Sequence, residues 1–183
     1  MIWVPLPEAV VEGTITNVGT AANKVTSYKV MRGETDVTAN YTFGDSVPGM
    51  LEITPRAVTL TSADAEKVYD GQPLTNGTVT VSGDGFVEGE GYTATVTGTI
   101  TDPGTAANTF TYTLNEGTLA GNYEIETVEG TLTVNKITTQ IVITADSASK
   151  MYDGEPLTKS TYTYTEGVIA EGDVLTAVVE GTI

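Results

Sequence analysis

The chain repeats itself, and this repeat limits its possible folds more than any other feature. Residues 58–100 match residues 141–183 without a gap at an offset of 83, with 19 identities in 43 positions. The best-matched stretch is Lys67-Val-Tyr-Asp-Gly-Gln-Pro-Leu-Thr75 against Lys150-Met-Tyr-Asp-Gly-Glu-Pro-Leu-Thr158. Such a period indicates an array of small modules, in which each module contacts its sequence neighbours, rather than one large domain.

A second match relates the beginning of the chain to its middle. Residues 9–28 align with residues 94–113 at an offset of 85, with 12 identities in 20 positions. The centre of this match is the sequence Gly-Thr-Ala-Ala-Asn, at residues 19–23 and 104–108. Two shorter likenesses extend it: residues 39–43 resemble 121–125, and residues 51–54 resemble 132–134. The N-terminal segment therefore corresponds to the second half of a repeat.

These matches divide the chain into three segments. Residues 57–136 form one complete repeat, residues 1–56 hold the second half of the preceding one, with 1–8 outside the repeat pattern, and residues 137–183 hold the first half of the next. The sequence Ala-Val-Val-Glu-Gly-Thr-Ile occurs both at 9–15 and at 177–183. Since no Gly/Ser-rich linker separates the segments, we expect neighbouring modules to form an extended rod.

Apolar and polar residues alternate with a period of two through most of the repeat, which predicts half-buried strands. The clearest alternating stretches are 58–61, 78–82, 92–97, 109–113 and 130–134. Turn-forming pairs and triplets separate them, such as Asp70-Gly71 and Asp102-Pro103-Gly104. Six or seven short strands in about 80 residues predict an all-β fold of tandem small β-sandwich-like modules, either immunoglobulin-like or β-grasp-like.

Composition excludes several classes of function. The formal net charge is −16, so the surface repels phosphate backbones, and we expect neither nucleic-acid binding nor membrane insertion. The chain contains no histidine and no cysteine, which removes the commonest general base and the ligands of ordinary zinc sites. The absence of these two residue types also rules out disulfides and Ser-His or Cys-His catalysis. We therefore predict that the protein is not an enzyme and has no cofactor.

The recurring motifs are an alternating strand that leads into K-x-Y-D-G-x-P-L-T, a G-T-A-A-N turn, an N-Y pair and a closing G-T-L-T-V strand. In these motifs the chain resembles the MBG/YDG-type tandem repeats of bacterial surface proteins and adhesins, especially those of Gram-positive gut bacteria. The resemblance implies an extracellular location at the cell surface or cell wall. It also implies a structural stalk or spacer role or, alternatively, repeats that themselves bind host glycan, mucin or protein.

The Tyr-Asp-Gly motif invites a catalytic interpretation, because tyrosine and aspartate can both transfer protons. No nucleophile or metal set accompanies it, and turn chemistry accounts for every position. We therefore interpret the motif as structural and expect Tyr69, Tyr123 and Tyr152 to be core residues. The motif residues are Lys67, Tyr69, Asp70, Gly71 and Pro73 in one copy, and Lys150, Tyr152, Asp153, Gly154 and Pro156 in the other.

Three further hypotheses concern ligands and cross-links. Tyr162 and Tyr164 lie two residues apart on one predicted strand, where a pair of exposed rings would stack on a sugar. Acidic residues gather at two places, which raises the possibility of Ca²⁺, although a solvated turn is the simpler explanation. The aligned lysines and asparagines suggest an isopeptide bond, for which a solvated lysine and a turn asparagine are the alternative. The acidic residues are Asp84, Glu88, Glu90, Glu166, Glu171 and Asp173; the possible cross-link joins Lys67 or Lys150 to Asn40 or Asn122.

The two partial repeats are complementary, which bears on assembly. Each lacks strands that the other contains, so exposed strand edges are expected on both. Besides neighbouring repeats, a partner is therefore a second copy of the chain: residues 137–183 of one molecule would accept residues 16–56 of another in a head-to-tail fibre or ring. Partial disorder of the half-repeats is the alternative.

Overall fold

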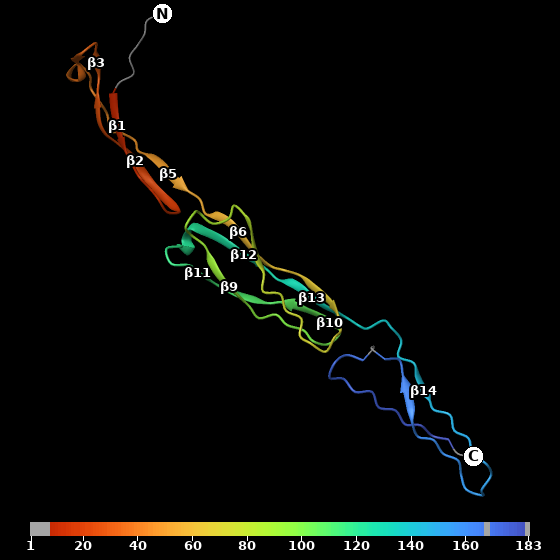
Figure 1. Cartoon of the computed structure of the whole chain (residues 1–183). Helices are drawn as coiled ribbons and strands as arrows, with labels where there is room; N and C mark the ends of the chain where they lie inside the picture. The colour runs from red at the N-terminus through yellow and green to blue at the C-terminus, as the bar shows by residue number, and fades with distance from the viewer. Residues whose placement is uncertain (1–7, 167–168, 182–183) are drawn as a thin grey trace, which may run out of the picture. The chain divides into compact units, whose positions relative to one another are not determined.

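The computed structural model describes residues 8–166 and 169–181, with the backbone alone at Glu8. Within these residues the fold is all-β, with short strands, two 3-10 turns and no α-helix (Figure 1). The predicted fold class is thus confirmed. Residues 1–7 of the predicted non-repeat segment 1–8 lie outside the described residues. So do residues 167–168 and the last two residues of the second Ala-Val-Val-Glu-Gly-Thr-Ile copy.

Seventeen elements follow one another along the chain. The N-terminal segment contains β1 (Glu8–Glu12), β2 (Gly19–Lys29), β3 (Met31–Arg32), β4 (Thr35–Asp36), η1 (Thr38–Asn40) and β5 (Gly49–Ile53). The middle contains β6 (Arg56–Ser62), β7 (Ala65–Val68), β8 (Val79–Gly83), β9 (Tyr92–Val96), β10 (Gly104–Asn108), β11 (Phe110–Leu114), η2 (Ala120–Asn122), β12 (Tyr123–Val128) and β13 (Gly130–Asn135). The C-terminal segment contains β14 (Ile143–Ala145) and β15 (Tyr162–Tyr164).

The strands form small sheets. The three-stranded sheets have the orders β1-β2-β5, β10-β13-β7 and β12-β6-β8, and the two-stranded ones pair β9 with β11, β14 with β15, and β3 with β4. The chain divides into two compact units, which are described separately below. One comprises Met1–Thr59, Ser82–Gly91 and Leu114–Glu126, and the other comprises Leu60–Val81, Tyr92–Thr113 and Thr127–Ile183.

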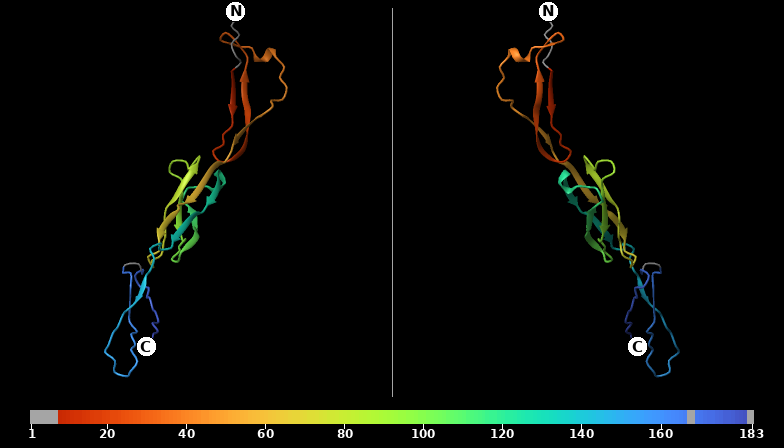
Figure 2. Two further views of the ribbon diagram at one scale, coloured as in Figure 1. Left: turned by 90° about the vertical axis from the view of Figure 1, so that its right-hand side faces the viewer. Right: turned by 90° about the vertical axis from the view of Figure 1, so that its left-hand side faces the viewer.

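The N-terminal segment repeats the local geometry of the middle one. In the pair β2–β5, Asn23 lies opposite Gly49, and in the pair β10–β13, Asn108 lies opposite Gly130. The 3-10 turns η1 and η2 also recur, each just before the tyrosine of an Asn-Tyr pair. Figure 2 shows β1 and β2 side by side as an antiparallel hairpin. The aligned sequences therefore fold alike, as two copies of one repeat should.

One sequence prediction about this region is wrong. The Gly-Thr-Ala-Ala-Asn stretch is a strand in both copies, whereas the sequence motif predicts a turn. The chain reverses just before it, and the glycines at 19 and 104 have positive φ angles of 141° and 156°. The residues after each glycine are then free to pair with β5 or β13.

The number of strands in the middle of the chain also differs from the prediction. Strands β7, β10 and β12 were not predicted, so this part of the chain has eight strands, β6 to β13, rather than six or seven.

A buried polar cluster holds β13 in place within the second unit. The Ser62 hydroxyl donates to the Asn108 carbonyl oxygen at 2.6 Å and accepts from the Gly130 N–H at 2.9 Å. The Asn108 amide donates to the carbonyl oxygens of Ala63 and Asn76 at 2.8 and 2.9 Å. Ser62 and Asn108 are both fully buried, so these bonds satisfy groups that water does not reach. Leu60, Leu132 and Val134 supply the buried apolar residues of the same unit.

The C-terminal segment is less completely paired, and this corrects the prediction for Tyr152. In the middle of the chain β7 lies beside β13, and the Tyr69 N–H donates to the Asn135 carbonyl oxygen at 2.8 Å. Residues 148–152 form no strand, and Tyr152 is 93% exposed rather than a core residue. Tyr69 is half-buried, and Tyr123, 8% exposed, is the one core tyrosine of the three.

The tight approach of β13 to the end of β6 can be tested at Gly130. A Cβ at this position would overlap the Ser62 carbonyl oxygen and lie 2.7 Å from the Ala63 carbonyl oxygen, and neither backbone atom can move aside easily. We expect Gly130→Ala to lower the free energy of unfolding by about 3 kcal/mol because the strand must shift to relieve the overlap. Urea denaturation measures the loss.

Gly77 provides the matched control. A Cβ added to it would lie more than 4 Å from every described atom outside its chain neighbours, and its φ is not positive. Gly77→Ala should leave the unfolding free energy within about 0.5 kcal/mol of the parent. Equal effects of the two substitutions would contradict the close packing of β13.

Candidate functional site

The Lys-x-Tyr-Asp-Gly motif forms a turn held by its own side chains. The Asp70 carboxylate accepts a hydrogen bond from the Gln72 N–H at 2.9 Å, which closes an Asx turn. The Lys67 ammonium reaches the same carboxylate oxygen at 2.6 Å and the Gln72 carbonyl oxygen at 2.5 Å. Gly71 has a φ of 78°, a conformation that favours glycine. The lysine and aspartate side chains of the motif are thus both used within the turn.

The second copy has the same geometry. The Lys150 ammonium lies 2.7 Å from the Asp153 carboxylate and 2.8 Å from the Glu155 carbonyl oxygen, and the Glu155 N–H donates to Asp153 at 3.0 Å. The φ of Gly154 is 82°. Because this turn forms beside a strand in one copy and without one in the other, it is a local structure that the motif encodes by itself.

Both aspartates have lowered pKa values for the same reasons. The hydrogen bond from the Lys67 ammonium and then the Gln72 N–H lower the pKa of Asp70 below its ordinary value of 3.8. The Lys150 ammonium and the Glu155 N–H lower the pKa of Asp153 in the same way. These are surface ion pairs within one turn, so they favour charged carboxylates and cannot supply a proton at neutral pH.

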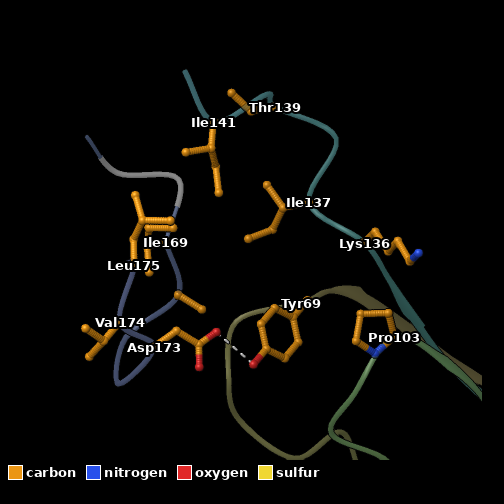
Figure 3. Close-up of a pocket in the computed structure, with 11 residues that line it drawn as sticks. Tyr69, Pro103, Lys136, Ile137, Thr139, Ile141, Ile169, Asp173, Val174 and Leu175 are labelled. Carbon is orange, nitrogen blue, oxygen red and sulfur yellow. Dashed lines mark hydrogen bonds between the residues drawn. The ribbon is translucent and has the colours of Figure 1, made fainter. Parts of the chain in front are cut away.

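The tyrosine of the motif takes no part in the turn. In the first copy its hydroxyl points to a cavity of about 370 Å³ in the second unit, where it donates to the Asp173 carboxylate at 2.9 Å (Figure 3). This bond raises the pKa of Tyr69 above its ordinary value. The other cavity walls are mainly apolar: Pro103, Ile137, Ile141, Ile169, Val174 and Leu175. The cavity lies where the middle repeat meets the segment after it, and we call it the second joint.

A corresponding cavity lies in the first unit, where the N-terminal segment meets the middle repeat, and we call it the first joint. It has a volume of about 250 Å³. The Asn122 side chain accepts from the Val18 N–H at 2.9 Å, and its amide group donates to the Asn17 side-chain oxygen at 3.1 Å. The Tyr123 hydroxyl accepts from the Val87 N–H at 3.1 Å and donates to Glu90 at 2.5 Å.

The two joints share two aligned positions of the repeat but differ in the tyrosine that each one uses, Tyr123 at the first and Tyr69 at the second. Glu90 and Asp173 are aligned at the offset of 83, and each accepts a hydrogen bond from a tyrosine. Val18 and Pro103 are aligned at the offset of 85, and each lines its cavity. From the sequence, these acidic residues are interpreted as solvated turn residues or calcium candidates, and the joints are not predicted. The signal was present in the recurring Glu-Gly followed by an acidic residue, at 88–90 and 171–173.

The other proposed site residues differ in their burial and in their hydrogen-bond partners. Tyr162 is half-buried, and its hydroxyl donates to the Leu175 carbonyl oxygen at 3.1 Å, whereas Tyr164 is 40% exposed. Within residues 8–166 and 169–181 no group of three or more acidic side chains is placed to hold a metal ion. The side chains of Lys67, Lys150 and Asn122 all bind the partners given above.

Loss of the lysine should change the titration of the turn. We expect Lys67→Met to raise the pKa of Asp70 toward 3.8, because the largest cause of its lowering is removed. A lowered pKa in the folded state stabilises the fold above pH 3.8, and this contribution disappears as the pH falls through the folded value. Carboxyl carbon chemical shifts followed by NMR measure the change.

Asp153 serves as the internal control, since its lysine partner is Lys150 and is untouched by this substitution. An unchanged pKa of Asp70 in Lys67→Met, or an equal shift of Asp153, would show that the lysine does not hold the turn.

The described residues contain no helix with the length and hydrophobicity needed to cross a bilayer. Comparison with curated proteins and with solved structures found no match. Comparison with family models matches residues 58–133 to the MBG domain (YGX type). MBG domains occur in surface proteins, and the family is of a structural or adhesin type. The resemblance seen in the sequence motifs is therefore confirmed: residues 58–133 of this chain match the model of the MBG domain family.

Proposed function

We propose that this chain is a structural spacer in a bacterial surface protein, exposed outside a Gram-positive-like cell wall, and that it performs no catalysis. The observation that carries the proposal is that a joint cavity, lined in part by aligned positions of the repeat, forms at two successive places where segments meet. A spacer needs modules that meet their neighbours in a fixed way, and a joint at each meeting of segments gives successive repeats a defined connection. The short connections between segments support the same interpretation.

The chemistry of the joints suits a stiff connection. The first joint is held by two hydrogen bonds of the Asn122 side chain, which reach both backbone and side chain of the preceding segment. The second combines an apolar lining with the Tyr69–Asp173 hydrogen bond. Apolar contact supplies affinity, while the directional polar bonds restrict rotation. Under this proposal, successive repeats extend as a rod.

Joint stiffness can be measured by pulsed electron spin resonance. Because the chain has no cysteine, spin labels attached to Lys24→Cys and Glu126→Cys report the first joint alone. We expect a single narrow distance distribution in the parent chain. Asn122→Ala should broaden it, since the bonds to Val18 and Asn17 are lost.

Asn115→Ala is the matched control, an asparagine substitution in the same unit outside the joint cavity. A broad distribution in the parent chain, or one that Asn122→Ala leaves unchanged, would contradict the spacer proposal.

The alternative is that the repeats themselves bind host glycan, mucin or protein, and Tyr164 is the residue that favours it. Its side chain is 40% exposed on β15, opposite the exposed Ile143 of β14. Stacking on a sugar needs such a ring. Binding of the full chain to a glycan or mucin array that Tyr164→Ala abolishes, and Thr163→Ala does not, would favour this alternative over a pure spacer.

Exposure of the flanking segments supports a second copy of the chain as a partner. Leu60 is fully buried, whereas its aligned counterpart Ile143 is 47% exposed, and Tyr123 is 8% exposed against 55% for Tyr41. Positions that are buried in the middle repeat are thus exposed in the flanking segments. We infer that residues 137–183 accept residues 16–56 of another copy. Light scattering should show mass rising with concentration, and a constant monomer mass would exclude this partner.

A further inference from the structure

The path of the chain through the middle repeat places its two ends on neighbouring parallel strands. The chain enters through β6, passes directly into β7 and leaves through β13. β7 and β13 pair in parallel, with Ala65 opposite Leu132 and Val68 opposite Asn135. Both strands belong to the second unit, and β13 lies between β7 and β10 in its sheet.

This topology determines how a pulling force acts on the repeat. Tension applied through the chain pulls the beginning of β7 one way and the end of β13 the other way. In a parallel pair these are opposite ends, so the strands are sheared along their length and the ladder bonds carry the force together. Had the two strands been antiparallel, the same tension would pull on adjacent ends and break the bonds one at a time.

Side chains extend the parallel ladder at both ends. At its beginning the Asp64 carboxylate accepts from the Thr131 N–H at 2.6 Å. At its end the Asn135 amide donates to Glu66 at 2.5 Å, and the Tyr69 N–H donates to the Asn135 carbonyl oxygen. The pairing, which is only four residues long as a strand, is thus continued by polar contacts from residue 64 to residue 69.

The same place is anchored to the buried cluster. The Gly130 N–H, just before the ladder, donates to the Ser62 hydroxyl, and Asn108 ties the chain around Ala63 to β10. Sliding β13 past β7 therefore requires that buried polar bonds break without water to replace them, which raises the barrier to unfolding.

We propose that β7 and β13, with Asp64, Glu66 and Asn135, form a shear clamp that makes this repeat resistant to mechanical unfolding. The clamp extends the spacer proposal and depends on it, because a spacer on a cell surface must transmit tension without extending. Resistance to force is a kinetic property and depends on the pulling direction, so it is separate from equilibrium stability.

Single-molecule force measurements on the full chain test the clamp by pulling in two directions. Handles attached at Pro55→Cys and Lys136→Cys shear the two strands, while handles at Gln72→Cys and Lys136→Cys pull on their adjacent C-terminal ends and peel them apart. The absence of native cysteine makes both attachments specific. We expect an unfolding force about threefold higher in the shearing direction, because the bonds break together rather than in sequence.

Asp64→Ala separates the clamp from general stability. It should lower the shearing force, whereas peeling from the other end should require the same force as before, because the Asp64–Thr131 bond breaks last in that direction. Equal forces in the two directions, or a shearing force unchanged by Asp64→Ala, would overturn the clamp. That result would not affect the spin-label distances at the first joint, which test the spacer proposal independently of the clamp.

Discussion

The placement of β13 is the constraint on which the middle of the molecule depends. This strand pairs with β10 on one side and with β7 on the other, and it begins at a glycine that touches the backbone at the end of β6. The buried Ser62 hydroxyl and the Asn108 side-chain NH₂ group bind backbone groups where these strands converge, and of the described buried side-chain polar atoms Asn108 Oδ1 alone has no hydrogen-bond partner. Because unpaired groups at this depth would each cost about 1–3 kcal/mol, the cluster specifies one register for the strands around it.

The same constraint explains why identical sequences differ in structure along the chain. Residues 9–12 of the Ala-Val-Val-Glu sequence form strand β1 beside β2, but the same four residues at 177–180 form no strand. Strand formation depends on a partner that supplies hydrogen bonds and covers the apolar face, more than on intrinsic preference. The turn of the Lys-x-Tyr-Asp-Gly motif behaves in the opposite way, since its hydrogen bonds all lie within the turn and both copies form it.

This contrast decides what the sequence could predict. The all-β class and the alternating strands follow from local patterns, and both predictions are confirmed. The Asp-Gly turn is also local and forms in both copies of the motif. The Gly-Thr-Ala-Ala-Asn strand and the exposure of Tyr152 depend on which strand lies alongside, so the prediction failed at both. The joints were missed for a related reason: Glu90 and Asp173 look like solvated acids until the tyrosine that each one binds is placed. Conversely, the Lys67 side chain binds within its own turn and the Asn122 side chain binds Val18 of the preceding segment, so both have partners other than a cross-link.

The central claim is that β13 is the strand around which the second unit is organised, and native-state hydrogen exchange tests it most directly. Amide protons of Leu132 and Val134, both buried, and of Gly130, bonded to the Ser62 hydroxyl, should exchange only through global unfolding. Those of Ile143 and Thr144 in the short pair β14–β15 should exchange far faster. Exchange of the β13 amides as fast as those of β14 would contradict the account.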